Sequence, residues 1–195
     1  MSTAFENGIG FVQPGIHKAY KREWAKQLLD DGTVYFTNLA VFQKEEHSQR
    51  GDPMEGTSVT IRQDVRCTAS YANPIFVWCS TMESDPDVIL STWTDRDSIV
   101  EVTDTLKLAE RMKDAAVARK PDFHGLYIGP VTYDKDRGSH RAYDWTEGIF
   151  QKNLRFNGQK EFRFALVGEQ HLECEDNLLL KLGKCTDIAR IITGE

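Results

Sequence analysis

The chain has 195 residues, of which 40% are hydrophobic and 28% charged, and its formal net charge is −6. This length predicts one domain with its own core, and the negative charge argues against general binding to nucleic-acid phosphates. No window contains the roughly 20 apolar residues that span a bilayer. The opening residues MSTAFENGIG also lack the basic start and apolar stretch of a signal peptide. We therefore expect a soluble, cytoplasmic protein without membrane contact, whose oligomeric state stays open.

Residues 1–15 contain several glycines and a proline, which predicts a weakly ordered lead-in before a single domain over residues 16–195. The pattern of residues 16–31 predicts a helix that ends at the glycine of Asp31-Gly32. Its expected inner face carries Trp24, Ala25, Leu28 and Leu29. Residues 33–37 are rich in β-branched and aromatic side chains, so they predict a strand, and residues 38–42 a turn of helix.

Residues 43–56 form a long polar segment that contains the motif RGDPMEG. Its proline and two glycines exclude regular structure, and long polar loops in compact domains are often functional. Arg50, Asp52 and Glu55 place one cation and two anions close together. Such a loop can organise a polar ligand, or its charges can pair with one another. The spacing lacks the alternating oxygen ligands of a calcium loop.

The remaining segments predict a mixture of strands and helices. Strands are expected at 58–61 and 64–68 (a hairpin), at 74–80 (the most apolar, hence central), and at 98–102 and 178–182. Residues 126–133 predict a strand with a kink, while 88–93 and 188–192 fit either a helix or a strand. Residues 105–119 predict an amphipathic helix with a buried stripe of Leu106, Leu108, Ala109, Met112 and Ala116. Few helices are long, so the fold class is α+β: a curved, mostly antiparallel sheet flanked by two or three helices.

The most informative stretch is FQKNLRFNGQKEFRFAL, residues 150–166. From Glu161 onward polar and aromatic residues alternate as in a half-buried strand. The two phenylalanines of this strand then share one face, and Glu161, Arg163 and Ala165 share the other. Gln159 joins the Glu161 side if the strand reaches that far back. Glu161 and Arg163 can flank a pocket, or Glu161 can form an ion pair with Arg163 or Lys152.

Two further groups are candidates for ligand contacts. His17 can hold a ribose or phosphate oxygen through its ring nitrogens, or it can be a surface histidine. Ser80 and Thr81 end the central strand, where hydroxyls meet ligands or cap the next turn. No GxSxG elbow is present, which argues against a serine hydrolase. The four cysteines have no CxxC spacing, so we expect reduced thiols rather than zinc ligands, with Cys79 buried as a small apolar residue.

The order of YFT, GDPMEG, FVWCS, F-x-K and E-F-R-F resembles a widespread family of uncharacterised phage and bacterial proteins, from Trp24 to Leu166. More weakly, Gln159-Lys160-Glu161 and Ser80-Thr81 resemble elements of the ADP-ribosyltransferase superfamily. That resemblance implies NAD as cofactor. Glu161 would stabilise the ribose cation, Gln159 would position the acceptor, and His17 and Tyr35 would hold NAD. Arg50, Asp52, Glu55, Ser80 and Arg163 complete the candidate ligand-binding residues.

Three functions follow as hypotheses. The leading one is an ADP-ribosyltransferase-like protein that binds NAD or a related nucleotide, as a toxin or a factor in phage–host conflict. The second is a non-catalytic phage or bacterial inhibitor that binds a host protein through an acidic surface. The third is a nuclease that holds Mg²⁺ with Asp52, Glu55 and Glu161.

Overall fold

The computed structural model describes residues 15–44, 56–62, 65–70, 72–119, 122–134 and 148–193, with the backbone alone for residues 57–62, 65–70 and 134. In this part of the chain the strands are β1 (Ile16–Tyr20), β2 (Thr33–Asn38), β3 (Thr57–Arg62), β4 (Val65–Ser70), β5 (Ile75–Thr81), β6 (Ser98–Val102), β7 (Phe123–Pro130), β8 (Thr132–Asp134), β9 (Gln151–Asn153), β10 (Glu161–Gly168), β11 (Asn177–Lys181) and β12 (Ala189–Thr193). The helices are α1 (Arg22–Asp31), α2 (Leu39–Lys44), α3 (Pro86–Thr92) and α4 (Thr105–Val117), with 3₁₀ turns η1 (Leu154–Gln159) and η2 (Gln170–Leu172).

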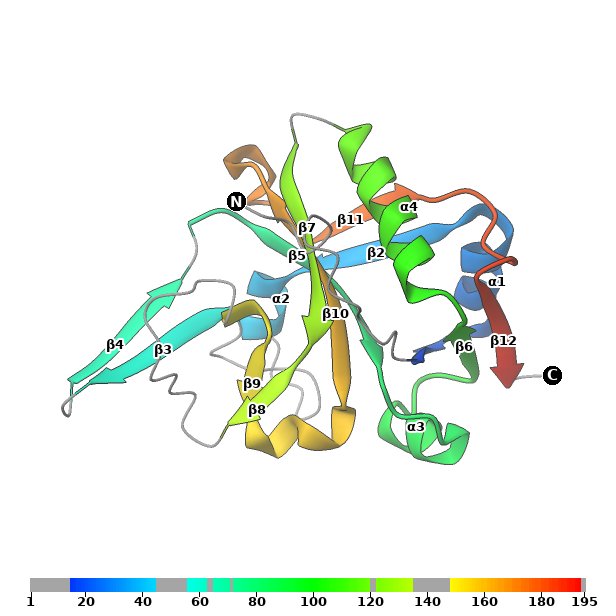
Figure 1. Cartoon of the computed structure of the whole chain (residues 1–195), viewed down its shortest axis with the longest axis horizontal. Helices are drawn as coiled ribbons and strands as arrows, with labels where there is room; N and C mark the ends of the chain where they lie inside the picture. Colours follow the sequence, from blue (N-terminus) through cyan, green and yellow to red (C-terminus); the bar gives the residue numbers. More distant parts are fainter. Residues whose placement is uncertain are drawn as a thin grey trace.

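The fold is α+β, with an open, mostly antiparallel sheet of eight strands, so the predicted fold class is confirmed. The strand order is β11-β2-β5-β1-β6-β12, and β10 and β7 continue from the other side of β5. The predicted hairpin is present as the antiparallel pair β3–β4, which Figure 1 shows projecting from the body of the molecule. The apolar run predicted as the central strand is β5, which pairs with three other strands.

The sheet splits along one edge of β5. On its other edge β5 pairs with β10 over its whole length, from Ile75 to Thr81. On the split edge it pairs with β2 only at Phe76 and Val77, and with β1 only at Thr81. The stretch between these two contacts, Trp78 to Ser80, therefore has no neighbouring strand on that side within the described residues. This gap positions the candidate site described below.

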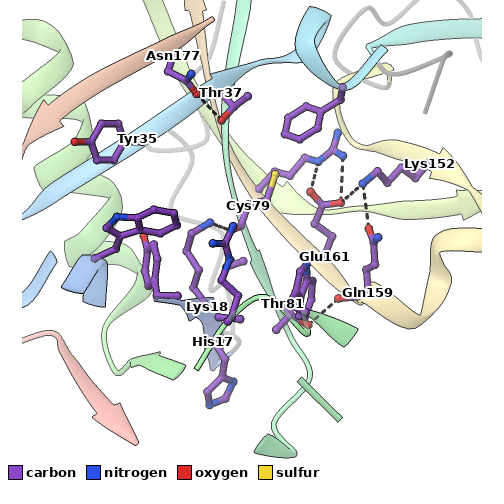
Figure 2. A pocket seen from close by; sticks show the side chains of 18 of the residues that line it. His17, Lys18, Tyr35, Thr37, Cys79, Thr81, Lys152, Gln159, Glu161 and Asn177 are labelled. Atoms are coloured by element: carbon purple, nitrogen blue, oxygen red, sulfur yellow. Dashed lines mark hydrogen bonds and ion pairs between the residues drawn. The ribbon is translucent and has the colours of Figure 1, made fainter. Parts of the chain in front are cut away.

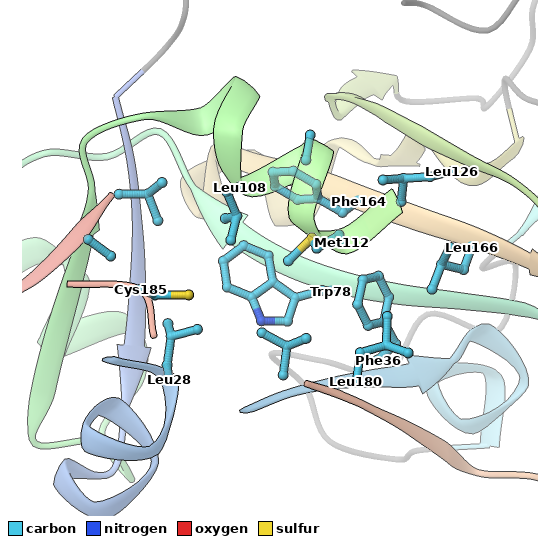
Figure 3. Close-up of a cluster of buried hydrophobic side chains, with 14 of the residues drawn as sticks. Leu28, Phe36, Trp78, Leu108, Met112, Leu126, Phe164, Leu166, Leu180 and Cys185 are labelled. Carbon is cyan, nitrogen blue, oxygen red and sulfur yellow. The ribbon is translucent and has the colours of Figure 1, made fainter. Parts of the chain in front are cut away.

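The main core lies on the face of the sheet that α1 and α4 cover (Figures 1 and 3). Trp78 is 1% exposed and packs edge-to-face on Phe164, with ring centroids 5.3 Å apart. Figure 3 places Leu28 of α1 and Met112 of α4 around the same indole. The indole nitrogen donates a hydrogen bond to the Tyr20 hydroxyl at 3.0 Å, so its polar atom is satisfied inside the core.

The opposite face of the sheet carries a smaller apolar cluster, made of Leu39, Ile75, Val77, Ile149 and Ala165. Because both faces of β10 pack against other residues, every residue of this strand is buried, and the expectation of a half-buried strand is wrong. The predicted division of its side chains is nevertheless confirmed: Phe162 and Phe164 belong to the main core, and Ala165 lies in the smaller cluster.

The predicted helix over residues 16–31 is wrong in its first third. Ile16–Tyr20 form β1, which pairs along β6, and the helix begins at Arg22. Ile16 and Tyr20 are buried in the main core, so tertiary packing overrides the local pattern. Three residues of the expected buried faces are less buried than predicted: Trp24 is 36% exposed, and Leu29 and Leu106 are partly exposed.

The ambiguous segments are now assigned. Residues 88–93 fall mostly in α3, where the Asp85 side chain caps the first turn by accepting from the Asp87 and Val88 nitrogens. Residues 188–192 belong mostly to β12, which pairs with β6 at the sheet edge. Within the described residues no helix is long and apolar enough to cross a membrane.

Candidate functional site

A cavity of about 530 Å³ opens at the split in the sheet (Figure 2). Its walls come from β1, β2, β5 and β10, from the segment after α3, and from the region of β9 and η1. The lining residues are His17, Lys18, Ala19, Tyr20, Trp24, Thr33, Tyr35, Thr37, Phe42, Cys79, Ser80, Thr81, Trp93, Arg96, Lys152, Gln159, Glu161, Arg163 and Asn177. Volumes of this size are typical of small-molecule sites.

A buried ionic cluster forms one end of the cavity, which we call the inner end: Lys152, Gln159, Glu161 and Arg163. Arg163 Nε donates to Glu161 Oε1 at 2.9 Å, and Nη2 donates to Oε2 at 3.1 Å. Lys152 Nζ donates to the same Glu161 Oε2 at 2.9 Å and to Gln159 Oε1 at 3.0 Å. The three charged side chains are at most 7% exposed. Both predicted ion-pair partners of Glu161 are therefore present at once.

The backbone at Lys160 allows Gln159 and Glu161 to reach one ammonium group. Lys160 has φ 43° and ψ 47°, a left-handed conformation that L-residues other than glycine rarely adopt. Its carbonyl accepts from the Met82 nitrogen at 2.8 Å, and its side chain pairs with Glu83 at 2.6 Å. Gln159 is not part of β10, as one reading of the sequence had it, but ends η1. The turn, rather than strand alternation, brings its amide to Lys152.

Burial and neighbouring charges set the state of the ionisable groups here. Burial alone would raise the pKa of Glu161, but Arg163 and Lys152 together hold it well below its ordinary value of 4.5. Glu161 is therefore ionised at neutral pH. Burial, aided by the Glu161 charge, raises the pKa of the Cys79 thiol to about 12. Burial likewise raises the pKa of the Tyr133 hydroxyl, which accepts a hydrogen bond from the Glu161 backbone nitrogen at 2.8 Å.

Two more cations, Lys18 and Arg96, and several aromatic rings also line the cavity. Lys18 Nζ lies 4.6 Å from the Trp78 ring centroid and 5.3 Å from that of Tyr20, and it donates to the carbonyl of Cys79. This carbonyl belongs to the stretch of β5 that has no strand partner, so a side chain supplies the missing donor. The Arg96 guanidinium lies 4.8 Å from the Trp24 ring centroid. Stacking of this kind leaves a cation beside an aromatic surface.

The predicted site residues on β1, β2 and β5 also line this cavity, but they differ in exposure and in their hydrogen bonds. Tyr35 is 52% exposed, and Figure 2 shows it apart from the ionic cluster. His17 lies on β1 and is 6% exposed, and its Nδ1 atom has no hydrogen-bond partner among the described residues. The Ser80 hydroxyl donates to the Phe162 carbonyl at 2.9 Å, so it ties β5 to β10. The Thr81 hydroxyl donates to the Gln159 carbonyl at 2.7 Å, so it ties the end of β5 to the end of η1.

Three predicted residues, Arg50, Asp52 and Glu55, lie outside the described residues, so their relation to the cavity stays a prediction. The same holds for a shared magnesium ion between Asp52, Glu55 and Glu161. Among the residues that the structure does describe, no group of three or more histidine, cysteine, aspartate or glutamate side chains has the geometry to hold a metal ion.

Sequence reasoning missed several lining residues. Lys152 was considered only as a partner of Glu161, although its place in F-x-K ahead of Gln-x-Glu-x-Arg was a usable signal. Lys18 was noted beside His17 but was given no role, and Arg96 carried no signal, because its position follows from the segment after α3. Cys79, expected to be buried as a small apolar residue, is partly buried and lines the cavity.

Among the described side chains, Cys79, Cys174 and Cys185 form no disulfide.

Comparisons were made with protein-family models, with curated proteins and with solved structures. None of them matches this chain.

Proposed function

We propose that the cavity binds NAD or a related nucleotide and that the chain is an ADP-ribosyltransferase-like protein. One observation carries this proposal. Six predicted site residues from four separate segments line a single cavity, namely His17, Tyr35, Ser80, Gln159, Glu161 and Arg163. The sequence alone does not reveal the sheet split, and β1, β2, β5, β10 and the end of η1 bring these residues to one place.

The chemistry of the walls supports a nucleotide as the ligand. The volume of about 530 Å³ lies within the usual range for ligand pockets. The aromatic rings of Tyr20, Trp24 and Tyr35 are flat surfaces on which a base can stack. The cavity is also lined by lysine and arginine side chains, which can bind phosphate groups. The Nδ1 atom of His17 is buried and has no hydrogen-bond partner among the residues that the structure describes, so a ribose or phosphate oxygen would satisfy this polar group.

The roles within the site follow from these contacts. His17 and Tyr35 would hold the nucleotide, and Glu161 would face the carbon at which positive charge develops when the glycosidic bond breaks. Gln159 would position the acceptor. The geometry supports binding more directly than cleavage, because Arg163 and Lys152 already neutralise Glu161. Ionised Glu161 is a weak proton acceptor, so its contribution to cleavage would be electrostatic.

Thermal unfolding with added NAD tests the binding half of the proposal. A ligand that binds only the native state at a hundred times its Kd adds about 2.7 kcal/mol of stability. We expect the unfolding temperature to rise with NAD concentration and to stay unchanged with an equal concentration of sodium chloride. An unfolding temperature that does not change with NAD up to millimolar concentrations would contradict the proposal that the cavity binds NAD.

Nicotinamide release from NAD, followed by chromatography, tests the catalytic half. We expect Glu161→Ala to abolish release, while Glu173→Ala, which removes an exposed carboxylate elsewhere, leaves it unchanged. Release that is equal in the wild type and in Glu161→Ala would exclude Glu161 as a catalytic residue. Toxicity on expression in a bacterial host, relieved by Glu161→Ala, is the expected sign of a role in conflict between phage and host.

A further inference from the structure

We infer that the wall of the cavity formed by β2 and β11 is a subsite for the adenine base of a nucleotide. Tyr35 is the surface on which the base stacks, and Asn177 recognises the edge of the base. The inference rests on the proposed function in that the same cavity holds the nucleotide, and it specifies which residues bind the base. Tyr35, Thr37 and Asn177 all line the cavity, and we call them the base wall.

The register of the sheet places the base wall on the same face as Glu161. Residues directly opposite each other on neighbouring antiparallel strands point to one face of a sheet. Asn177 of β11 lies opposite Thr37 of β2, and Thr37 in turn lies opposite Val77 of β5. Val77 lies opposite Ala165 of β10, and Glu161 has the same parity as Ala165 on that strand. The base wall and Glu161 therefore face one continuous space, in agreement with the lining of the cavity.

The two ends of the cavity are far enough apart to hold the two halves of a dinucleotide. Asn177 and Ala165 lie in one row across three strand spacings of about 4.8 Å, and Glu161 follows four residues of about 3.3 Å along β10. The Cα atoms of Asn177 and Glu161 are therefore roughly 20 Å apart. Figure 2 shows Tyr35 and Asn177 on one side of the cavity and Glu161 on the other. With Glu161 at the glycosidic bond to nicotinamide, the adenine of the same dinucleotide lies at the base wall.

Tyr35 presents an open aromatic surface at the split in the sheet. If the pairing of Thr37 with Val77 continued, Tyr35 would lie opposite Cys79, but β2 and β5 separate before that point. Tyr35 is 52% exposed although it lines the cavity. Within the described part of the chain, neither another ring nor a cation packs on its ring. Aromatic side chains in such positions bind bases by stacking, because every base has a π-face.

Asn177 offers the hydrogen-bonding groups that match adenine. Its Oδ1 atom accepts from the Thr37 hydroxyl at 2.9 Å, and within the described residues its amide makes no other side-chain hydrogen bond. A carbonyl oxygen accepts two hydrogen bonds, so one lone pair and the NH₂ group remain for a ligand. Adenine has its amino donor beside a ring acceptor on both of its edges, so an amide can bind either edge with two hydrogen bonds. Guanine and hypoxanthine have two acceptors, N7 and O6, on one edge, which an amide cannot match in this way.

Substitutions in the base wall separate stacking from recognition of the edge. Tyr35→Leu removes the ring, so AMP should bind roughly tenfold more weakly, whereas Tyr35→Phe keeps the ring and should bind AMP as the wild type does. The wild type should prefer AMP to inosine monophosphate roughly tenfold. Asn177→Leu should weaken AMP binding and abolish this preference, while Tyr35→Leu should keep it. Gln170→Leu is the control, because it removes an exposed, hydrogen-bonded amide that does not line the cavity.

The experiment measures dissociation constants of AMP, inosine monophosphate, NAD and nicotinamide mononucleotide by calorimetry in these five proteins. Tyr35 and Asn177 are exposed, so the variants without ligand should keep the unfolding temperature of the wild type. Nicotinamide mononucleotide has a ribose and a phosphate but no adenine, so its affinity should be the same in all five proteins. A loss of its affinity in Tyr35→Leu or Asn177→Leu would overturn the inference, because these residues would then not act on the base alone.

The same ligands separate this inference from the proposed function. Binding of NAD together with equal AMP affinity in all five proteins, or without AMP binding in any, would overturn the inference and leave the proposed function standing. AMP binding with the expected pattern, but without binding of NAD or nicotinamide mononucleotide, would support the adenine subsite and contradict the proposed function.

Discussion

Lys160 lies between two residues of the ionic cluster and is the non-glycine residue with positive φ in the described part of the chain. A residue in this conformation costs about 1–2 kcal/mol relative to glycine. Such a strained conformation persists only where surrounding contacts stabilise it. Here the Lys160 carbonyl accepts a hydrogen bond from the Met82 nitrogen, and the Lys160 side chain forms an ion pair with Glu83. The conformation is thus tied to the geometry of the site, because it directs Gln159 and Glu161 toward Lys152.

Substitutions at Lys160 test this strain. Lys160→Ala and Lys160→Gly both lose the ion pair with Glu83, but glycine alone relieves the backbone. We expect the glycine variant to be more stable than the alanine variant by about 1 kcal/mol in urea unfolding. In regular helices and strands the order is reversed, by about 0.5–1 kcal/mol. An alanine variant equal to or more stable than the glycine variant would contradict the strained conformation.

Cys79 lines the cavity but should be chemically inert in the folded protein. The thiolate is the reactive form, and burial raises the pKa of this thiol to about 12. We expect iodoacetamide at pH 8 to modify the exposed Cys174 in the folded protein while Cys79 stays unmodified until the chain is denatured. Peptide mass spectrometry after short reaction times measures both. Modification of Cys79 at the rate of Cys174 would show that its surroundings are not those described.

Single residues also show what sequence reasoning can and cannot find. The period of two placed Glu161 and Arg163 on one face, which made an ion pair between them one of the two open interpretations. The exposure of Trp24 was not predictable. The apolar period shows which residues share one face of a helix, but it does not show which other elements pack against that face. Trp24 instead lies beside Arg96 at the cavity, a contact set by the segment after α3.

At the scale of elements, the end of α1 is fitted closely to the end of β11. Gly32 has φ 68° and ends the helix, and its carbonyl accepts from the Leu182 nitrogen at 3.0 Å. A Cβ atom at Gly32 would collide with the Gly183 carbonyl and come within 2.8 Å of the Leu182 Cβ. Gly183 itself has φ 74° with open space around the position of a Cβ.

These two glycines form a matched pair for a stability test. Gly183→Ala meets only the backbone penalty of the left-handed region, about 1 kcal/mol. Gly32→Ala meets the same penalty and a backbone clash, so we expect a loss of stability at least about 1–2 kcal/mol larger than for Gly183→Ala. Chemical denaturation of both variants measures the difference. Equal losses would mean that α1 and β11 do not meet as closely as described.

The elements themselves were largely predictable where the local pattern and the tertiary contacts agree. Thr33–Thr37, the run ending at Ser80, and the helix from Thr105 follow directly from residue type and period. Residues 16–20 were assigned to a helix because β1 is short and is followed by α1 after a single residue, Lys21. A strand of five residues between two partners gains its stability from pairing, which a local pattern does not contain.

At the scale of the whole molecule, carboxylates held by cations make stability depend on pH in the acid range. Glu161 has a pKa well below 4.5 because Arg163 and Lys152 surround it. The pKa of Asp187 is lowered from 3.8 to about 2, chiefly by a hydrogen bond from Lys107, with Arg111 adding to it. A carboxyl with a depressed folded pKa contributes stability above its unfolded pKa and loses that contribution as the pH falls toward the folded value.

We therefore expect the free energy of unfolding to be insensitive to these groups above about pH 5 and to fall steadily below about pH 4. Asp187→Asn should reduce the slope of this fall between pH 4 and pH 2, because one of the titrating groups is gone. Urea unfolding at several pH values measures the slopes in the two proteins. A variant with an unchanged or steeper slope would contradict the assigned pairing of Asp187.

The overall class was accessible from the order of the elements, but the split in the sheet was not. The split arises because β5 pairs with three strands that are far apart in the sequence, namely β1, β2 and β10. Strand pairing of this kind depends on the complete sheet, so the sequence alone does not predict the cavity.

Calorimetric titration of NAD into the wild type and into Thr37→Trp tests most directly whether the cavity binds a nucleotide. Thr37 lies on β2 and lines the cavity, and strands accept tryptophan readily, so the substitution fills the space and keeps the fold. The account predicts one binding site in the wild type and none in Thr37→Trp, with similar unfolding temperatures for both proteins without ligand. Absence of binding heat in the wild type, or equal affinity in the two proteins, would contradict it.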